Sequence, residues 1–335
     1  MAYEDLVATI DILSQSGKGI LAADESIGTI GKRFAAIGIE NSEANRRDYR
    51  LLLASAPDIE SYINGVILFE ETFSQTNDKG ENIAAIFAKK GILPGIKVDK
   101  GLIPLVNTEN DKITQGLDGL PERVKQFKAK GARFAKWRNV YSISEDSPSF
   151  GALRIGADLL AQYAAICQNE GIVPIVEPEV LIDGDHTIEM CADVSAMVLQ
   201  AVFEALYIHQ VELEFMVLKP SMVTAGKAHS PFSSSEEIAD FTLDVFRHHV
   251  PCAVPTINFL SGGQTSKQAT ENLNAINQAG GPWNLSFSYG RALQDDCLKV
   301  WSGKKENVEA AQAALLKRAR LNSLATAGKY NPKEE

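Results

Sequence analysis

The sequence has few residues of the kinds that indicate a disulfide scaffold or a metal protein. Its five histidines form neither an HxH nor an HExxH pattern, and the one tempting cluster, Asp183 to His186, is expected to make a turn or cap a helix. No metal and no cofactor are therefore expected. The scatter of the four cysteines, with no CxxC pair, predicts reduced thiols in a reducing compartment. They are Cys167, Cys191, Cys252 and Cys297.

Motifs for nucleotides and segments for membranes are also lacking. No complete Walker A loop is found, and no GxGxxG motif follows a predicted strand, so nucleotide use is unsupported. Residues 1–12 contain Glu4, Asp5 and Asp11 and do not form a secretion signal, and no later segment is expected to approach a membrane span. A net charge of −10 argues against nucleic acid and anionic membranes as partners. The cytoplasm is the expected location.

The composition is that of an ordinary globular protein, with 45% hydrophobic and 23% charged residues. Apolar runs of strand length alternate with helical patterns, and their near-continuous apolar character suits parallel strands covered on both faces. The runs are 18–23, 63–69, 91–98, 132–135, 172–176, 215–218, 254–260 and 285–287. This alternation predicts an α/β protein, a (β/α)8 TIM barrel in one domain over 1–335, with a C-terminal helix and short tail from about 305. An open doubly wound sheet is the alternative.

Helix-boundary residues support the same division of the chain. Ser42 precedes a predicted helix that runs to 54, and Pro121 opens one that Gly131 closes. Ser233 or Ser234, each with a glutamate three residues later, predicts a capping box. A further helix is predicted over 307–320. The polar stretches 107–119 and 225–235 are expected to be excursions on the barrel rim.

A single lysine ends the apolar run from Val211 to Leu218. Lys219 is followed by Pro220, which has no N–H for a strand ladder, so the strand should stop there. A lysine with its stem in apolar packing is partly desolvated, and desolvation can lower a lysine pKa enough to leave a neutral amine that attacks a carbonyl. Taken alone, such a lysine more often reaches solvent or pairs with an acid.

The other predicted strands also end in polar residues, which changes that interpretation. In a barrel the carboxyl ends of the strands meet at one face, and this face holds the active site. Stability does not require so many polar groups there, since neutral turn residues would serve. The strand-end residues are Asp24, Lys97, Lys136, Arg138, Glu177, Glu179, Lys219, Ser261 and Arg291.

Two groups of residues near these ends are suited to phosphate. Ser261-Gly262-Gly263 and Gly290-Arg291 follow the last two strands and offer backbone N–H groups and a guanidinium. Barrels commonly bind phosphate after these strands. A second group is predicted across the mouth of the barrel: Ser26, Thr29, Arg33, Lys97 and Arg138.

The sequence resembles class I fructose-1,6-bisphosphate aldolases over nearly its whole length. The matching motifs are GILAADES (19–26), PGIKVDKG (94–101), GARFAKWR (131–138), VPIVEPE (173–179), LKPSMV (218–223), FLSGGQ (259–264) and FSYGRAL (287–293). The resemblance implies an aldehyde-lyase that reversibly cleaves fructose 1,6-bisphosphate to dihydroxyacetone phosphate and glyceraldehyde 3-phosphate through a lysine Schiff base, in glycolysis and gluconeogenesis. It also implies a cytosolic, metal-free homotetramer.

The resemblance further implies a role for each strand-end residue. Lys219 would form the Schiff base, Glu177 would shuttle the proton for carbinolamine dehydration, and Asp24 would take the proton of the C4 hydroxyl. Lys136 and Glu179 would tune the charge around Lys219. The residues implied for the C1 phosphate are Ser261, Gly262, Gly290 and Arg291, and those for the C6 phosphate are Ser26, Thr29, Lys97 and Arg138, with Arg33.

Three points stay open from the sequence. Tailed members of the family end in a tyrosine that reaches the site, whereas this sequence matches through Tyr330 and ends at Glu335. We therefore expect Glu177 or water to protonate the enamine, and this step to limit turnover. Another Schiff-base sugar-phosphate lyase, of the transaldolase or deoxyribose-phosphate aldolase kind, is the second interpretation. A non-catalytic sugar-phosphate-binding scaffold is the third.

Overall fold

The computed structural model describes residues 2–335, in which eight parallel strands close into a barrel in the order β1-β10-β9-β8-β7-β6-β3-β2. Pairing of β1 with β10 closes the barrel, so the (β/α)8 fold is confirmed and the open sheet is excluded. The strands are β1 (Gly19–Ala23), β2 (Ile63–Leu68), β3 (Leu93–Lys97), β6 (Phe134–Tyr141), β7 (Val173–Val180), β8 (Val217–Leu218), β9 (Thr256–Phe259) and β10 (Asn284–Tyr289).

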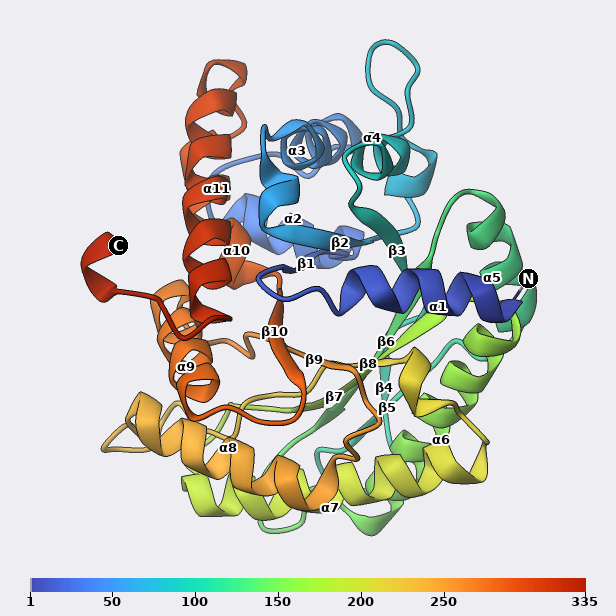
Figure 1. Ribbon diagram of the computed structural model, residues 1–335, viewed down its shortest axis with the longest axis vertical. Coiled ribbons are helices and arrows are strands. Elements are labelled where there is room, and N and C mark those ends of the chain that lie inside the picture. The colour runs from blue at the N-terminus through green and yellow to red at the C-terminus, as the bar shows by residue number, and fades with distance from the viewer. Residues whose placement is uncertain (1) are drawn as a thin grey trace.

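Helices surround the barrel, as Figure 1 shows. They are α1 (Ala2–Leu13), α2 (Ile27–Ala35), α3 (Glu43–Ser55), α4 (Ile83–Lys89), α5 (Leu120–Ala129), α6 (Phe150–Asn169), α7 (Ile188–Ile208), α8 (Ser235–His249), α9 (Ser266–Ala279), α10 (Arg291–Trp301) and α11 (Val308–Ala325). The predicted cap of α3 is confirmed, since the Ser42 side chain accepts the Asn45 N–H. Ser234 caps α8 in the same way, but the full capping box is elsewhere, between Thr265 and Gln268 at the start of α9.

Apolar side chains fill the amino-terminal half of the barrel interior. Helix α1 lies across this end of the barrel (Figure 1) and packs Leu6, Ile10 and Leu13 against the inward-facing strand residues. Phe134 fills the centre because β3 has a glycine beside it: a Cβ on Gly95 would lie 2.1 Å from the ring. The polar interior side chains therefore have room only toward the carboxyl ends of the strands.

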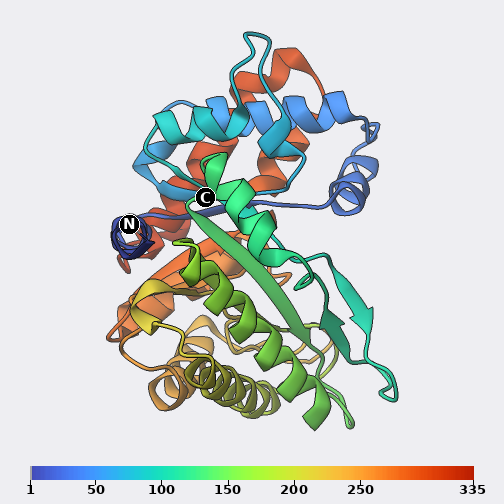
Figure 2. The ribbon, with the colours of Figure 1, turned by 90° about the vertical axis from the view of Figure 1, so that its right-hand side faces the viewer.

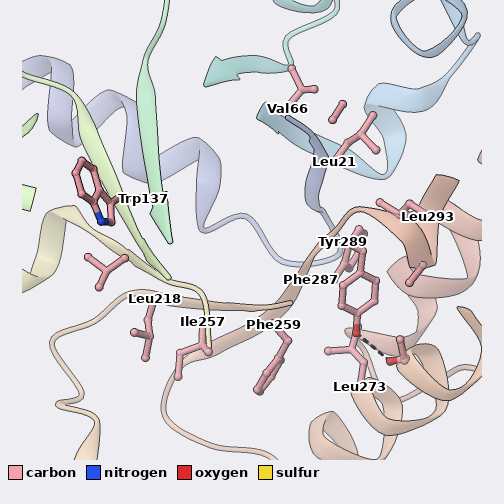
Figure 3. Packing of buried hydrophobic residues seen from close by; sticks show 14 of the residues in the cluster. Leu21, Val66, Trp137, Leu218, Ile257, Phe259, Leu273, Phe287, Tyr289 and Leu293 are labelled. Carbon is pink, nitrogen blue, oxygen red and sulfur yellow. Dashed lines mark hydrogen bonds between the residues drawn. The ribbon is translucent and has the colours of Figure 1, made fainter. Parts of the chain in front are cut away.

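The second and larger core lies between the barrel and its helices. Alternate strand residues point outward into it, and Figure 3 shows Trp137, Leu218, Ile257 and Phe259 among them. Tyr289 is buried in the same layer and donates its hydroxyl to the carbonyl of Ala269 at 2.9 Å, which ties β10 to α9. Burial of this layer fixes which face of every strand looks into the barrel.

The largest differences from the predicted strand bounds concern β6, β7 and β8. β6 and β7 continue through their charged residues to Tyr141 and Val180, because those charges face the barrel interior while their neighbours stay in the outer core. The strand expected up to Leu218 is reduced to two residues. Residues 213–215 form a 3-10 helix instead, since the glutamates at 212 and 214 do not suit a buried strand.

One expectation about hydrophobic segments is wrong. Helix α7 is long and apolar enough, by length and composition, to cross a membrane. In the structure it packs against α6, α8 and β7 and buries residues such as Val198 and Val202, as a core helix of the barrel does.

The polar stretch after β3 forms a projection on the rim, as predicted. Residues 102–114 contain an antiparallel pair, β4 (Leu102–Pro104) and β5 (Lys112–Thr114). Figure 2 shows this hairpin at the opposite side of the molecule from α1. The carboxyl face of the barrel is therefore the open one.

Candidate active site

Strand alternation places the charged residues of β6 and β7 inside the barrel. Phe134, Lys136 and Arg138 alternate with outward-facing Ala135 and Trp137, so both cations look inward above the phenylalanine. The same period places Glu177 and Glu179 inside from β7. Lys219 follows Val217 on the inner side, and its N–H continues the ladder to the carbonyl of Val176 at 2.8 Å.

A cavity of about 710 Å3 opens at this face. All the residues to which the sequence assigns a role at the site line it, so the strand-end constellation is brought together: Asp24, Ser26, Thr29, Arg33, Lys97, Lys136, Arg138, Glu177, Glu179, Lys219, Ser261, Gly262, Gly290 and Arg291. Gly263, which the sequence also offered for phosphate, is not among the lining residues.

Four side chains, of which Lys136, Glu177 and Lys219 are buried and Asp24 is partly buried, form a continuous ionic chain at the floor of the cavity. Lys219 Nζ lies 3.0 Å from Glu177 Oε1, and Glu177 Oε2 lies 3.2 Å from Lys136 Nζ. Lys136 Nζ also lies 2.8 Å from Asp24 Oδ2. Both carboxylates form an ion pair with the Lys136 ammonium, so this one cation compensates two negative charges.

The opposite charges in this series of ion pairs stabilise one another. Burial alone would raise the pKa of Glu177 and Asp24, but the nearby Lys136 and Lys219 ammonium groups outweigh burial and lower the pKa of both carboxyls. Burial likewise opposes the charge of Lys136, yet Asp24 and Glu177 raise its pKa above the usual lysine range. Asp24 and Glu177 are therefore carboxylates, and Lys136 an ammonium, at neutral pH.

Glu179 has a different partner from the one that its predicted role suggests. Its carboxylate accepts a hydrogen bond from Arg138 Nε rather than from Lys219. Its charge is thus largely compensated by a guanidinium.

The residues predicted for one phosphate lie on two adjacent segments of the rim. Ser261 and Gly262 follow β9, and Gly290 is the N-cap residue of α10. The first N–H groups of a helix have no partner within the helix, and its dipole favours an anion there. The Arg291 side chain is exposed and makes no hydrogen bond or ion pair within residues 2–335, so its guanidinium is available to a ligand.

The second predicted phosphate group is less compact than expected. Ser26 caps α2, and its hydroxyl lies 3.0 Å from that of Thr29, at another helix N-terminus facing the cavity. Arg33 lies against Gly290, with Nη2 3.8 Å from where a Cβ would stand there, and so is closer to the other group. Lys97 and Arg138 stand on the far wall and are held by carboxylates.

A buried glutamate that the sequence reasoning left out organises this part of the rim. Glu25 accepts hydrogen bonds from Arg33 and from Arg50 Nη2, the latter at 2.6 Å, and its Oε1 lies 3.1 Å from Gln294 Nε2. Gln294 also donates to the carbonyl of Ala22 at 2.7 Å. The end of β1 is thereby fixed to α2, α3 and α10. The only sequence signal was an acid directly after Asp24.

Removing the buried partner of Glu25 should destabilise the protein. Arg50→Ala leaves a desolvated carboxylate with one guanidinium instead of two, and breaking a buried ion pair costs on the order of 3 kcal/mol. Urea unfolding followed by tryptophan fluorescence measures the change. Arg47→Ala on the same helix is the matched control: its pairs are exposed, and such pairs contribute less than about 1 kcal/mol. Equal midpoints for the two variants would contradict the role of Glu25.

Other polar residues of the cavity were also missed. Lys32 is the neighbour of Arg33 on α2, and Ser288 turns a buried hydroxyl, which has no partner among the described residues, inward from β10. Asp99, two residues after the end of β3, accepts a hydrogen bond from Lys97. The segment from Asp183 to His186 is an irregular connection before α7, whose cap is Thr187. Within residues 2–335, no group of three or more His, Cys, Asp or Glu side chains is placed to hold a metal ion.

Fold and cavity together define an enzyme of the (β/α)8-barrel class with a lysine–carboxylate centre below anion-accepting rim segments. The sequence profile of the family "Fructose-bisphosphate aldolase class-I" matches residues 5–335. Fructose-bisphosphate aldolase 2 of Caenorhabditis elegans is 53% identical over 94% of this chain and 87% of its own. The cytoplasmic isozyme of Cicer arietinum is 52% identical over 98% of this chain and 92% of its own.

Chloroplastic fructose-bisphosphate aldolase 2 of Arabidopsis thaliana is 51% identical over 99% of this chain and 83% of its own. A solved structure of fructose-bisphosphate aldolase from Plasmodium falciparum, in complex with TRAP and a small-molecule inhibitor, superposes with a TM-score of 0.97 at 50% identity, covering 98% of this chain and 96% of that one. The chain belongs to the class I fructose-bisphosphate aldolase family. The family and the enzyme class, an aldehyde-lyase, predicted from the motifs are confirmed.

Proposed function

We propose that this protein cleaves fructose 1,6-bisphosphate reversibly to dihydroxyacetone phosphate and glyceraldehyde 3-phosphate, with Lys219 as the Schiff-base residue. The observation that carries the proposal is the contact of Lys219 Nζ with Glu177 at 3.0 Å, inside a cavity with cationic rim segments. A nucleophilic amine needs a base within hydrogen-bond reach, and Glu177 is that base.

Schiff-base formation follows from the ionic chain. Glu177 accepts a proton from Lys219 as the amine attacks the C2 carbonyl of the ketose, giving a carbinolamine. The same carboxyl group then protonates the carbinolamine hydroxyl, which leaves as water, and an iminium remains. Lys136 lies 3.2 Å from Glu177, and its ammonium compensates the negative charge of Glu177 once Glu177 has donated its proton to the carbinolamine.

Cleavage uses the Asp24 carboxylate, which lies at the opposite end of the series of ion pairs from Lys219. Asp24 accepts the proton of the C4 hydroxyl, the C3–C4 bond breaks, and its electron pair moves to the iminium to give an enamine. Lys136 holds Asp24 at 2.8 Å and lowers its pKa, so Asp24 is ionised and ready as a base. Glyceraldehyde 3-phosphate leaves, the enamine takes a proton at C3, and water releases dihydroxyacetone phosphate from Lys219.

The two phosphates would occupy opposite parts of the cavity. Ser261, Gly262, Gly290 and Arg291 suit the C1 phosphate, because backbone N–H groups and an unengaged guanidinium meet there. The C6 phosphate would lie toward the lysine of β3 and the N-terminus of α2. The residues for this end are Ser26, Thr29, Lys97 and Arg138, with Arg33 between the two sites.

Chemical trapping tests the proposed function. Incubation with dihydroxyacetone phosphate and sodium borohydride should attach the triose to one lysine, and peptide mass mapping should locate it at Lys219. Labelling of another lysine, or no labelling of active protein, would refute the assignment.

Loss of the free guanidinium should weaken substrate binding. Arg291→Ala removes a charge-assisted contact to phosphate, so KM for fructose 1,6-bisphosphate should rise about tenfold to a hundredfold. Steady-state kinetics measures this, and trapping at Lys219 should survive at high ligand concentration. Lys299→Ala, an exposed cation in the last turn of the same helix, is the matched control. If Arg291→Ala keeps the wild-type KM, Arg291 is only a rim charge.

We also propose a single-domain subunit that acts as a cytoplasmic homotetramer. The outer faces of α6 and α7 support self-association: Ile155, Met197 and Ile208 are 39%, 45% and 59% exposed. A groove of about 310 Å3 between these helices is lined mainly by apolar residues. Light scattering tests the assembly, and cell fractionation tests the location.

A further inference from the structure

Asp99 stands between the two parts of the site and has no role in the scheme above. It follows β3 at the carboxyl face and is 7% exposed. Its Oδ1 accepts a hydrogen bond from Lys97 Nζ at 2.6 Å and another from the Gly101 N–H at 3.2 Å. Lys97 Nζ donates in addition to the Asp99 carbonyl at 2.9 Å. Two of the three N–H bonds of this ammonium are therefore engaged by one residue.

The backbone that presents Asp99 is fixed on both sides. Val98 donates its N–H to the carbonyl of Lys136 at 3.1 Å and accepts from Arg123 Nη1 at 2.8 Å. Lys100 donates its N–H to the carbonyl of Gln115 at 2.8 Å. An acceptor held this rigidly orients the ammonium that binds it, and orientation before binding reduces the entropy lost when a ligand arrives.

We propose that Asp99 is a positioning residue that directs the remaining N–H of Lys97 into the cavity, toward the phosphate farther from Lys219, and so sets the preference for ketose bisphosphates over ketose 1-phosphates. The proposal rests on the proposed function. Asp99 is itself anionic and lines the cavity, so it binds no phosphate and acts only through its lysine.

The other carboxylate oxygen links the same residue to the reactive centre. Asp99 Oδ2 is buried, has no hydrogen-bond partner in the described chain, and lies 3.9 Å from Lys136 Nζ. This distance exceeds a hydrogen bond, whereas Asp24 and Glu177 bind the same ammonium at 2.8 and 3.2 Å. Loss of the Asp99 charge should therefore affect Lys97 far more than Lys136.

A double-variant cycle with two substrates tests the proposal. In Asp99→Asn, kcat/KM for fructose 1,6-bisphosphate relative to fructose 1-phosphate should fall about tenfold, mainly through KM for the bisphosphate. Lys97→Ala should lower this ratio at least as much, because it also leaves Asp99 unpaired and repelling phosphate. The double variant should be no worse than Lys97→Ala, since Asp99 has nothing left to position.

Three results would overturn the proposal. The first is an unchanged substrate ratio in Asp99→Asn; the second is independent effects that multiply in the double variant. The third is an equal change of the substrate ratio in Glu70→Gln, the matched control. The Glu70 carboxylate binds Lys100 at 3.0 Å on the same rim and is 48% exposed.

Trapping of dihydroxyacetone phosphate at Lys219 separates failure of this proposal from failure of the proposed function. That ligand has no second phosphate, so its trapping should be unaffected in Asp99→Asn.

Discussion

Lys219→Ala should abolish turnover and the borohydride-dependent label together. The substitution removes the amine that forms the covalent intermediate, and loss of a nucleophile commonly costs on the order of 10⁴-fold or more in rate. Lys136 is the nearest candidate to replace it, but its ammonium is bound by Asp24 at 2.8 Å and by Glu177 at 3.2 Å. Single-turnover kinetics with fructose 1,6-bisphosphate, followed by mass analysis after borohydride reduction, measures both effects.

Lys219→Arg is the informative companion. It keeps a positive charge beside Glu177, but the guanidinium is never deprotonated and cannot attack a carbonyl. Lys219→Ala and Lys219→Arg should both be inactive, although only Lys219→Ala removes the positive charge beside Glu177. Turnover that survives in Lys219→Arg would mean that the residue acts through its charge, and the covalent mechanism would be wrong.

Glu177→Gln should slow the formation of the Schiff base by about 10²- to 10⁴-fold, the range over which general acid–base groups act. The amide keeps the size of the side chain but neither accepts the proton of Lys219 nor returns it to the carbinolamine hydroxyl. It also leaves Lys136 with one close carboxylate instead of two. Rapid quenching with borohydride at increasing times gives the rate of labelling.

Glu179→Gln is the matched control, two residues farther along the same strand. Its carboxylate binds Arg138 and does not touch Lys219, so the labelling rate should fall much less than in Glu177→Gln. Equal losses in the two variants would show that the strand needs negative charge in general. The proton-transfer role of Glu177 would then be unsupported.

The barrel was predictable because its signals are local. Each strand is an apolar run that ends at a charged or polar residue, and eight such runs alternate with capped helices. The ends of β6 and β7 were misplaced for a physical reason: Lys136 and Glu177 look like the end of a strand, yet they are strand residues that face an enclosed polar interior. Whether an inward-facing residue is apolar or polar depends on how close it lies to the carboxyl end of the barrel. The sequence of one strand does not show where that residue lies relative to the other strands.

The members of the site were predictable for the same local reason, but their partners were not. Lys219, Glu177 and Asp24 each end a run and each line the cavity. The bonds of Glu25 to Arg50 and of Arg138 to Glu179 join segments 25 and 41 residues apart. Such contacts depend on how elements that are distant in the sequence meet in space, so composition and periodicity contain no signal for them.

The inner ring of the cavity has a consequence for how the enzyme should respond to salt. Four carboxylates, Asp24, Asp99, Glu177 and Glu179, face four cations, Lys97, Lys136, Arg138 and Lys219. The ring is close to neutral, so the exposed cations outside it, Lys32 and Arg291, must attract the bisphosphate from a distance. At physiological ionic strength charges are screened beyond about 8 Å in water, whereas buried pairs are screened much less. Added salt should thus slow capture of the substrate while leaving the chemistry inside the barrel nearly untouched.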